Sequence, residues 1–231
     1  MYYDLLYILP ALLLSLWASL RVKLTYKKYS TVRASSGVTA AEAARRILDA
    51  NGLASVPIGR VAGELTDHYD PSAGVVNLSE AVYGSTSIAA IGVAAHECGH
   101  AIQHARGYAP LAIRSAIIPA TNIGSRLSTP LLLAGIFLSY YAERMIVLAY
   151  LGVLLFGLCV LFQLVTLPVE FNASRRALAI LRSDGMLAEG ELSGARRVLS
   201  AAAMTYVAAL ATAALQFLRL LAIARSNDRR R

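Results

Sequence analysis

Residues 96–100 read His-Glu-Cys-Gly-His, so that two histidines lie four residues apart. On an α-helix, His96 and His100 would stand on one face about 6 Å apart along the axis, which lets both imidazoles reach one zinc ion. Glu97 would point about 100° around the helix and reach a water on the metal. Zinc lowers the pKa of such a water to about 7, and a carboxylate can take its proton as the water attacks a carbonyl. The motif therefore predicts zinc-dependent hydrolysis with Glu97 as the general base.

A third histidine, His104, follows one helical turn after His100. It would lie about 12 Å along the axis from His96, and three imidazoles on a straight helix at this spacing cannot converge on one ion. His104 is therefore excluded as a ligand. Two interpretations stay open for it, a polar contact to a ligand or substrate and an ordinary surface histidine.

The composition indicates a membrane protein, because 57% of the 231 residues are hydrophobic and only 16% are charged. Residues 145–167 carry no charge and are long enough as a helix to cross a hydrocarbon core of about 30 Å. Residues 2–20, a stretch within 117–141 that contains Arg126, and residues 201–218 are further candidates. We expect about four transmembrane helices, the last of which either spans or lies buried against the others.

The distribution of charge indicates topology. Basic residues follow both the first and the third span, and the positive-inside rule places these segments in the cytoplasm. They are Arg21, Lys23, Lys27, Lys28 and Arg33 after the first span, and Arg175, Arg176, Arg182, Arg196 and Arg197 after the third. The net charge of +8 lacks the aromatic-interleaved pattern of nucleic-acid binding, so the lipid bilayer is the expected partner. The basic tail RSNDRRR conflicts with this scheme, since four crossings would export it.

Three soluble elements would position the motif. Thr39 and Glu42 form a capping-box pattern before an amphipathic helix that ends near Gly52. Short β-prone runs around residues 56–61 and 75–78 predict a two- or three-stranded sheet. The alanine-rich stretch 85–105 predicts the helix that carries the motif, and its uncharged part is too short to cross a membrane.

A third zinc ligand should come from another segment on the same side of the membrane. Glu170 lies in LPVEFNASRRAL, directly after the third span, where Pro168 can begin a new helix. A carboxylate there suits a His-His-Glu site. Two alternatives stay open: Glu170 as an acid that only stabilises a helix N-terminus, and His68 as the third ligand. Glu143 lies in the opposite loop and is excluded by topology.

Several stretches together resemble the YugP-type neutral zinc metallopeptidases of bacterial membranes, and the resemblance covers nearly the whole chain. These stretches are LTDHYDP, SIAAIGVAAHECGHAIQH, LPVEFNASRRAL and VLSAAAMTYVAAL. The order of HExxH helix, membrane hairpin and Glu-containing helix is more distantly similar to the membrane protease HtpX and its gluzincin relatives. The resemblance implies that His96, His100 and Glu170 are the zinc ligands, that Glu97 is the catalytic acid/base, and that the substrate is a protein or peptide.

The chain departs from the HtpX pattern at one position. Proteases of that type often carry an aspartate four residues after the ligand glutamate, and here that place is Ser174, with Asn172 nearby. The group that orients His96 or His100 therefore stays open. The resemblance also implies that the strand containing VVNLS is a sheet edge that pairs with an extended substrate. The candidates for oxyanion stabilisation are His68, Tyr69, His104 and Tyr108.

We therefore expect a mainly α, polytopic membrane protein with about four transmembrane helices and a small α+β zincin-like catalytic domain. The expected parts are an anchor (1–20), a cytoplasmic catalytic segment (21–115) with the HExxH helix at 85–105, a transmembrane hairpin (116–168), a cytoplasmic helical segment with the third ligand (169–200), and a C-terminal membrane helix with a basic tail (201–231). The expected function is that of a zinc endopeptidase of the bacterial plasma membrane. It would act at the cytoplasmic face on membrane or membrane-adjacent proteins.

Two other functions compete with this hypothesis. A non-proteolytic membrane scaffold or adaptor would hold a structural or vestigial metal, but a closed structural site usually needs four protein ligands. Three nominated ligands leave one position open for water, which favours an enzyme. An intramembrane protease would pair HExxH with an Asp-Gly inside another span, whereas Asp184 and Gly185 lie in the polar stretch RSDGMLAEG.

Overall fold

The computed structural model describes residues 2–228, within which the chain forms seven α-helices, one short 3-10 helix and three β-strands. The mainly α class is therefore confirmed. Met1, at the start of the expected anchor, and residues 229–231, at the end of the basic tail, lie outside the described residues. The chain divides into two compact units. Met1–Trp17, Ile113–Leu167 and Thr205–Arg231 form the first unit, and Ala18–Ala112 and Pro168–Met204 form the second.

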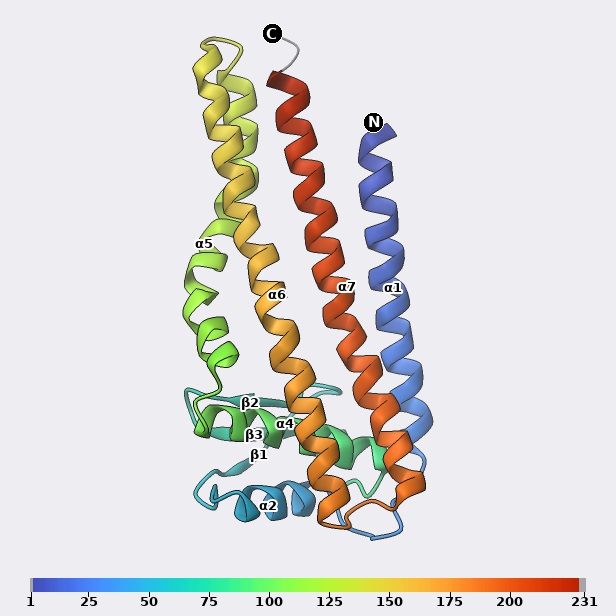
Figure 1. The fold of residues 1–231 in the computed structure, drawn as a ribbon. Coiled ribbons are helices and arrows are strands. Elements are labelled where there is room, and N and C mark those ends of the chain that lie inside the picture. Colours follow the sequence, from blue (N-terminus) through green and yellow to red (C-terminus); the bar gives the residue numbers. More distant parts are fainter. Residues whose placement is uncertain (1, 229–231) are drawn as a thin grey trace. The chain divides into compact units, whose positions relative to one another are not determined.

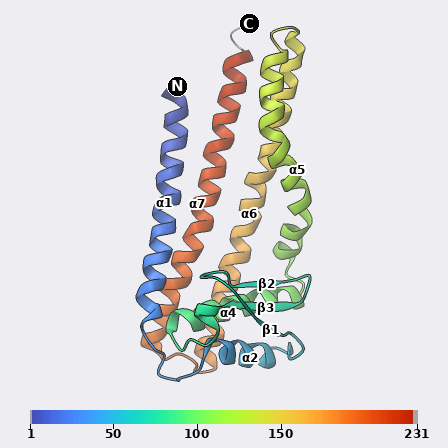
Figure 2. The same ribbon diagram turned by 180° about the vertical axis from the view of Figure 1, so that it is seen from behind.

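Portions of four long helices run alongside one another in the first unit (Figures 1 and 2). These helices are α1 (Tyr2–Ser30), α5 (Ala109–Leu138), α6 (Ile146–Ser183) and α7 (Glu189–Asp228). Glycines bring α5 and α6 close together, since an added Cβ at Gly124 would lie 2.7 Å from the carbonyl oxygen of Leu155. Gly135 packs in the same way against Ala149. With the 3-10 turn at Glu143–Met145 between them, α5 and α6 form an antiparallel hairpin.

Three of the helices are long and apolar enough to cross a membrane, namely α1, α6 and α7. Helix α5, which carries the second expected span, is not among these three helices of the described chain. Polar residues such as Asn122 and Arg126 interrupt its apolar side chains. If α6 spans the membrane, Glu170 can lie on the same side as His96 only if α5 also crosses, so the fourth crossing stays a prediction.

Helix α6 runs without a break from the apolar residues 146–167 into the segment that carries Glu170. The expectation that Pro168 begins a new helix is therefore wrong, because Pro168 lies inside α6. Proline removes the hydrogen bond to the carbonyl four residues earlier, but α6 continues past this one missing bond. Helix α7 likewise continues through the expected boundary at residues 200 and 201.

The core of the second unit lies between α2 (Ala40–Ala50) and α4 (Ile88–Ala105). The capping box before α2 is confirmed, since the Glu42 N–H donates to Thr39 Oγ1 at 3.3 Å and the Thr39 N–H donates to Glu42 Oε2 at 2.9 Å. Helix α4 begins after its N-cap Ser87, three residues later than expected. Fully buried Ile47 and Leu48 fill the space against the alanine-rich side of α4, so small side chains let the two helices pack closely.

The sheet has the strand order β1-β3-β2, which confirms a small three-stranded sheet. β1 (Ile58–Val61) pairs in parallel with β3 (Val75–Ser79), and β2 (His68–Asp70) pairs antiparallel with β3. A short helix, α3 (Glu80–Tyr83), follows β3. The expectation that VVNLS is a sheet edge is wrong, because this strand is β3 and lies in the centre. The edge next to α4 is β2, whose three residues are too few to show an alternating pattern.

Candidate metal centre

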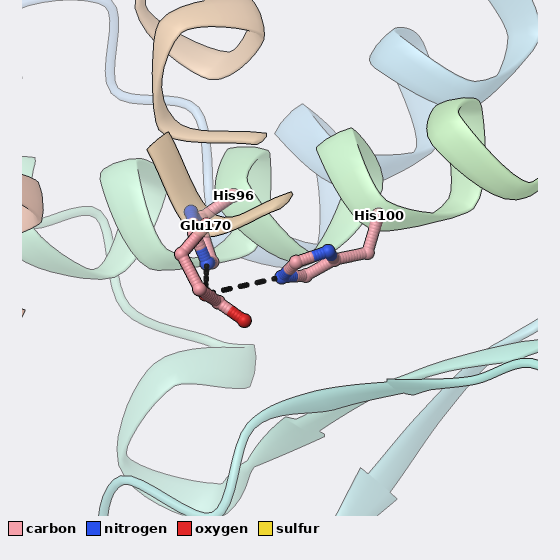
Figure 3. A group of neighbouring side chains, drawn as sticks. All are labelled: His96, His100 and Glu170. Atoms are coloured by element: carbon pink, nitrogen blue, oxygen red, sulfur yellow. Dashed lines mark ion pairs between the residues drawn. The ribbon is translucent and has the colours of Figure 1, made fainter. Parts of the chain in front are cut away.

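Three side chains from two helices meet in the second unit: His96 and His100 of α4, and Glu170 of α6 (Figure 3). Glu170 Oε2 lies 3.3 Å from His96 Nε2 and 3.5 Å from His100 Nε2. The two rings are nearly perpendicular, with an angle of 85° between their planes. Both Nε2 atoms therefore face the same carboxylate.

The geometry of these atoms fits a zinc ion. Zinc binds histidine nitrogen and carboxylate oxygen at about 2.0–2.2 Å, so two ligands in a tetrahedral site lie roughly 3.3–3.5 Å apart. The distances from Glu170 Oε2 to the two Nε2 atoms, 3.3 and 3.5 Å, match this spacing, and the ligand atoms of all three residues lie within 4.8 Å of one another. Two histidines and one glutamate are also a known ligand set of catalytic zinc, in which the fourth position is left for water.

Close packing of α4 and α6 brings Glu170 to the histidines. A Cβ on Gly99 would lie 2.8 Å from the carbonyl oxygen of Ala173 and 3.2 Å from its Cα. Gly99 directly precedes His100, and Ala173 follows Glu170 by three residues, so the contact lies beside the candidate metal site. This role of Gly99 was not predicted from the sequence, although a glycine inside an otherwise strong helix is a signal of close approach.

A buried amide orients His100. The Nδ1 atom of His100 lies 3.0 Å from Oε1 of Gln103, a side chain with no exposed surface. Gln103 Nε2 donates to the carbonyl oxygen of Val169 at 2.8 Å and to Asn172 Oδ1 at 3.0 Å. These two acceptors keep the amide oxygen of Gln103 toward His100. His100 therefore donates from Nδ1 and presents its Nε2 lone pair to a metal. Gln103 was not predicted from the sequence, where its only signal is its position about one helical turn after His100.

A different side chain contacts His96. Ser174 Oγ lies 3.2 Å from His96 Nδ1, so the residue at the position of the aspartate of HtpX-type proteases contacts His96. Asn172 Oδ1, which accepts from Gln103, also accepts from Arg176 Nε at 2.7 Å. Ser174 thus contacts His96, whereas Asn172 reaches His100 only through Gln103.

The carboxylate of Glu97 lies against the edge strand of the sheet. The Tyr69 N–H of β2 donates to Glu97 Oε2 at 3.0 Å, and only 8% of Glu97 is exposed. Its charge also acts on nearby His100. Burial alone lowers the pKa of His100, but the hydrogen bond with Glu170 and the negative charge of Glu97 outweigh burial, so the pKa lies above its ordinary value.

The other polar candidates lie outside the group formed by His96, His100 and Glu170. His68 is exposed, and its Nδ1 lies 2.8 Å from the carbonyl oxygen of Thr66. His104 Nδ1 lies 2.8 Å from the hydroxyl of Tyr69. Tyr108, the fourth oxyanion candidate, is half-buried just before α5. Among these candidates, Tyr69 contacts Glu97 through its backbone N–H and His104 through its hydroxyl.

Cys98, the central residue of the motif, points away from the candidate metal. Its thiol is buried and lies 3.6 Å from the carbonyl oxygen of Ala44 in α2. Burial, followed by the nearby charge of Glu97, raises the pKa of the Cys98 thiol far above its ordinary value. A thiol that stays protonated is a poor metal ligand, so Cys98 is a core residue.

Comparisons with known proteins agree on one family. The sequence profile of the family described as "Putative neutral zinc metallopeptidase" matches residues 4–225. The chain is also 51% identical over 215 residues to a protein of Bacillus subtilis (strain 168) named "Putative membrane protease YugP", and the alignment covers 93% of each chain. No solved structure shows significant similarity to the chain.

Proposed function

The chain belongs to the neutral zinc metallopeptidase family, and from this premise we propose that it is a membrane-bound endopeptidase with a His96, His100 and Glu170 zinc site. Family membership makes it a peptide-bond hydrolase. One observation carries the proposed site: the Nε2 atoms of both histidines lie 3.3 and 3.5 Å from one carboxylate oxygen, in a group whose ligand atoms all lie within 4.8 Å of one another. Three protein ligands leave a coordination position open, which favours this function over a scaffold with a structural metal.

The residues around the site suit hydrolysis. When bound, zinc would supply a Lewis acid that polarises a water and the scissile carbonyl. Gln103 and Ser174 hold the two imidazoles by their Nδ1 atoms. The Tyr69 N–H holds Glu97, whose carboxylate takes a proton from the attacking water and returns it to the leaving amine.

We also propose that β2 is the strand along which an extended substrate binds. The N–H of Tyr69 points to Glu97, and in an antiparallel strand the N–H and the C=O of one residue face the same side. The carbonyl of Tyr69 therefore also faces away from β3, toward the catalytic carboxylate. Pairing with this carbonyl would align a peptide backbone beside the metal site.

The location of the substrate follows from α6. Glu170 comes three residues after the uncharged stretch 145–167 in one continuous helix, which corresponds to about 5 Å along the axis. We therefore propose that the site faces the membrane surface and acts on membrane or membrane-adjacent proteins. The basic residues after the first and third spans support the cytoplasmic face of a bacterial plasma membrane, with α5 as the fourth crossing packed against α6.

The substitution Glu97→Gln tests the proposed mechanism. It keeps the size of the side chain and its acceptor for the Tyr69 N–H but removes the base. We expect bound zinc to stay at the level of the parent protein, while hydrolysis of a casein substrate falls by at least about a hundredfold. The matched control is Glu80→Gln, at an exposed acid of α3, which should cleave at the parent rate. Parent-level cleavage by the Glu97 variant would show that the base is another group.

A further inference from the structure

A cavity of about 540 Å³ lies in the second unit, between residues of α1, α6 and α7. Four arginines line it, namely Arg21, Arg175, Arg182 and Arg196, and each of them is exposed. No Asp or Glu is among the described residues that line the cavity. Arg182 pairs with Glu189 at 2.9 Å, a residue outside the lining. The cavity therefore presents a basic rim to solvent.

The floor of the same cavity is apolar. Leu178 of α6 and Leu199 and Met204 of α7 line it, and Leu199 is only 3% exposed. A volume of about 540 Å³ falls in the roughly 300–1,000 Å³ range of cavities that enclose organic ligands, which is far more than a lone phosphate ion fills. The combination of guanidinium groups and an apolar floor is complementary to an anionic headgroup with a hydrocarbon chain.

The arginines also stand at sequence positions where a membrane surface is expected. Arg21 directly follows the uncharged stretch 5–20 of α1, and Arg196 lies two residues before the uncharged stretch 198–218 of α7. Basic pockets between helices on the cytoplasmic side of membrane proteins bind acidic lipid headgroups. We propose that this cavity binds an anionic phospholipid, with its phosphate on Arg175 and Arg196 and an acyl chain against Leu178, Leu199 and Met204.

The cavity shares a wall with the metal centre. Ser174 lines the cavity and also lies 3.2 Å from Nδ1 of His96. A bound lipid would restrict the motion of Ser174 and so keep His96 oriented. This consequence for activity rests on the proposed function, whereas lipid binding itself does not.

Lipid binding is measured by native mass spectrometry of the detergent-purified full chain with dioleoylphosphatidylglycerol or with zwitterionic dioleoylphosphatidylcholine. We expect the anionic lipid to bind at least about tenfold more tightly, and the double variant Arg175→Gln/Arg196→Gln to lose this preference. The matched control is Arg46→Gln/Arg60→Gln, which removes the same charge from two exposed arginines outside the cavity and should keep it. Equal binding of both lipids by the parent, or equal loss in both double variants, overturns the proposal.

A second variant tests the apolar floor without changing charge. Ala179→Trp fills the cavity from an exposed lining position, so it should weaken phosphatidylglycerol binding while the unfolding temperature stays at the parent value. Parent-level lipid binding by this variant would show that the acyl chain does not lie in the cavity. Competition by inorganic phosphate at the same molar ratio would assign the rim to a free anion, and displacement by a casein-derived peptide would assign the cavity to substrate. Since the readout is bound lipid, its failure is distinct from a failure of peptide hydrolysis.

Discussion

At the scale of single residues, both imidazoles of the candidate metal centre are held by uncharged side chains. Gln103 contacts His100 and Ser174 contacts His96, where HtpX-type proteases often carry an aspartate at the serine position. A carboxylate partner would raise the basicity of its ligand, whereas an amide or a hydroxyl mainly fixes the ring orientation. The orientation of His100 therefore depends on the Gln103 amide, which in turn is held by the carbonyl of Val169 and the side chain of Asn172.

Gln103→Leu tests this orienting role. Leucine fills a similar volume but leaves the Nδ1–H of His100 without its acceptor, so we expect zinc affinity to fall by about 10–100-fold. Chelator competition measures the affinity, and thermal unfolding of the metal-free variant shows whether the fold survives the change. An unchanged affinity in a folded variant would mean that Gln103 serves packing alone. Gln163→Leu, in the apolar stretch of α6, serves as the control for a glutamine outside the site.

At the scale of elements, the approach of α4 to α6 decides whether the site can form. Gly99→Ala would place a methyl group 2.8 Å from the Ala173 carbonyl oxygen, so the two backbones must move apart. We expect a loss of stability of about 1–3 kcal/mol and a lower zinc affinity. The control is Gly92→Ala in the same helix, where the new Cβ would meet Ala195 Cβ at an ordinary 3.4 Å. Denaturant unfolding of the two metal-free variants measures the difference, and equal stability would contradict this account of the helix contact.

The edge strand β2 provides a second prediction at this scale. Tyr69→Pro removes the N–H that holds Glu97, and this N–H faces away from β3, so the sheet should tolerate the proline. We expect kcat to fall while bound zinc stays at the parent level. Tyr69→Phe keeps the N–H and removes only the hydroxyl contact with His104, so its kcat should stay closer to that of the parent. If the proline variant were the faster of the two, Glu97 would not depend on this strand.

Local signals account for the elements that the sequence predicted correctly. The capping box at Thr39 and Glu42 and the motif helix depend on residues a few positions apart, which a linear reading can recognise. The spacing of His96 and His100, which places both histidines on one face of α4, is a local signal of the same kind. Pro168 misled the prediction because proline usually ends a helix, and β2 was too short to leave a pattern. Gln103 and Gly99 depend on what α6 places against them, which the sequence of α4 does not contain.

At the scale of the whole molecule, the apolar surface indicates a lipid environment. Large hydrophobic side chains stand exposed on the long helices, with 60% exposure at Leu12 of α1, 60% at Leu133 of α5 and 68% at Leu154 of α6. An apolar surface of this extent would cause a protein to aggregate in water. The exposed Leu133 supports the proposal that α5 lies beside α6 in the bilayer. The polar residues of α5 nevertheless make it less apolar than α1, α6 and α7, the three helices that meet the hydropathy expected of a membrane span.

The most direct test of the central claim is the zinc content of the purified chain, measured by inductively coupled plasma mass spectrometry for the parent, Glu170→Gln and His68→Ala proteins. The account predicts about one zinc per chain in the parent and in the His68 variant, because a single His-His-Glu site binds one ion. It predicts loss of zinc in the Glu170 variant. Retention of zinc by Glu170→Gln together with its loss from His68→Ala would contradict the proposed ligand set.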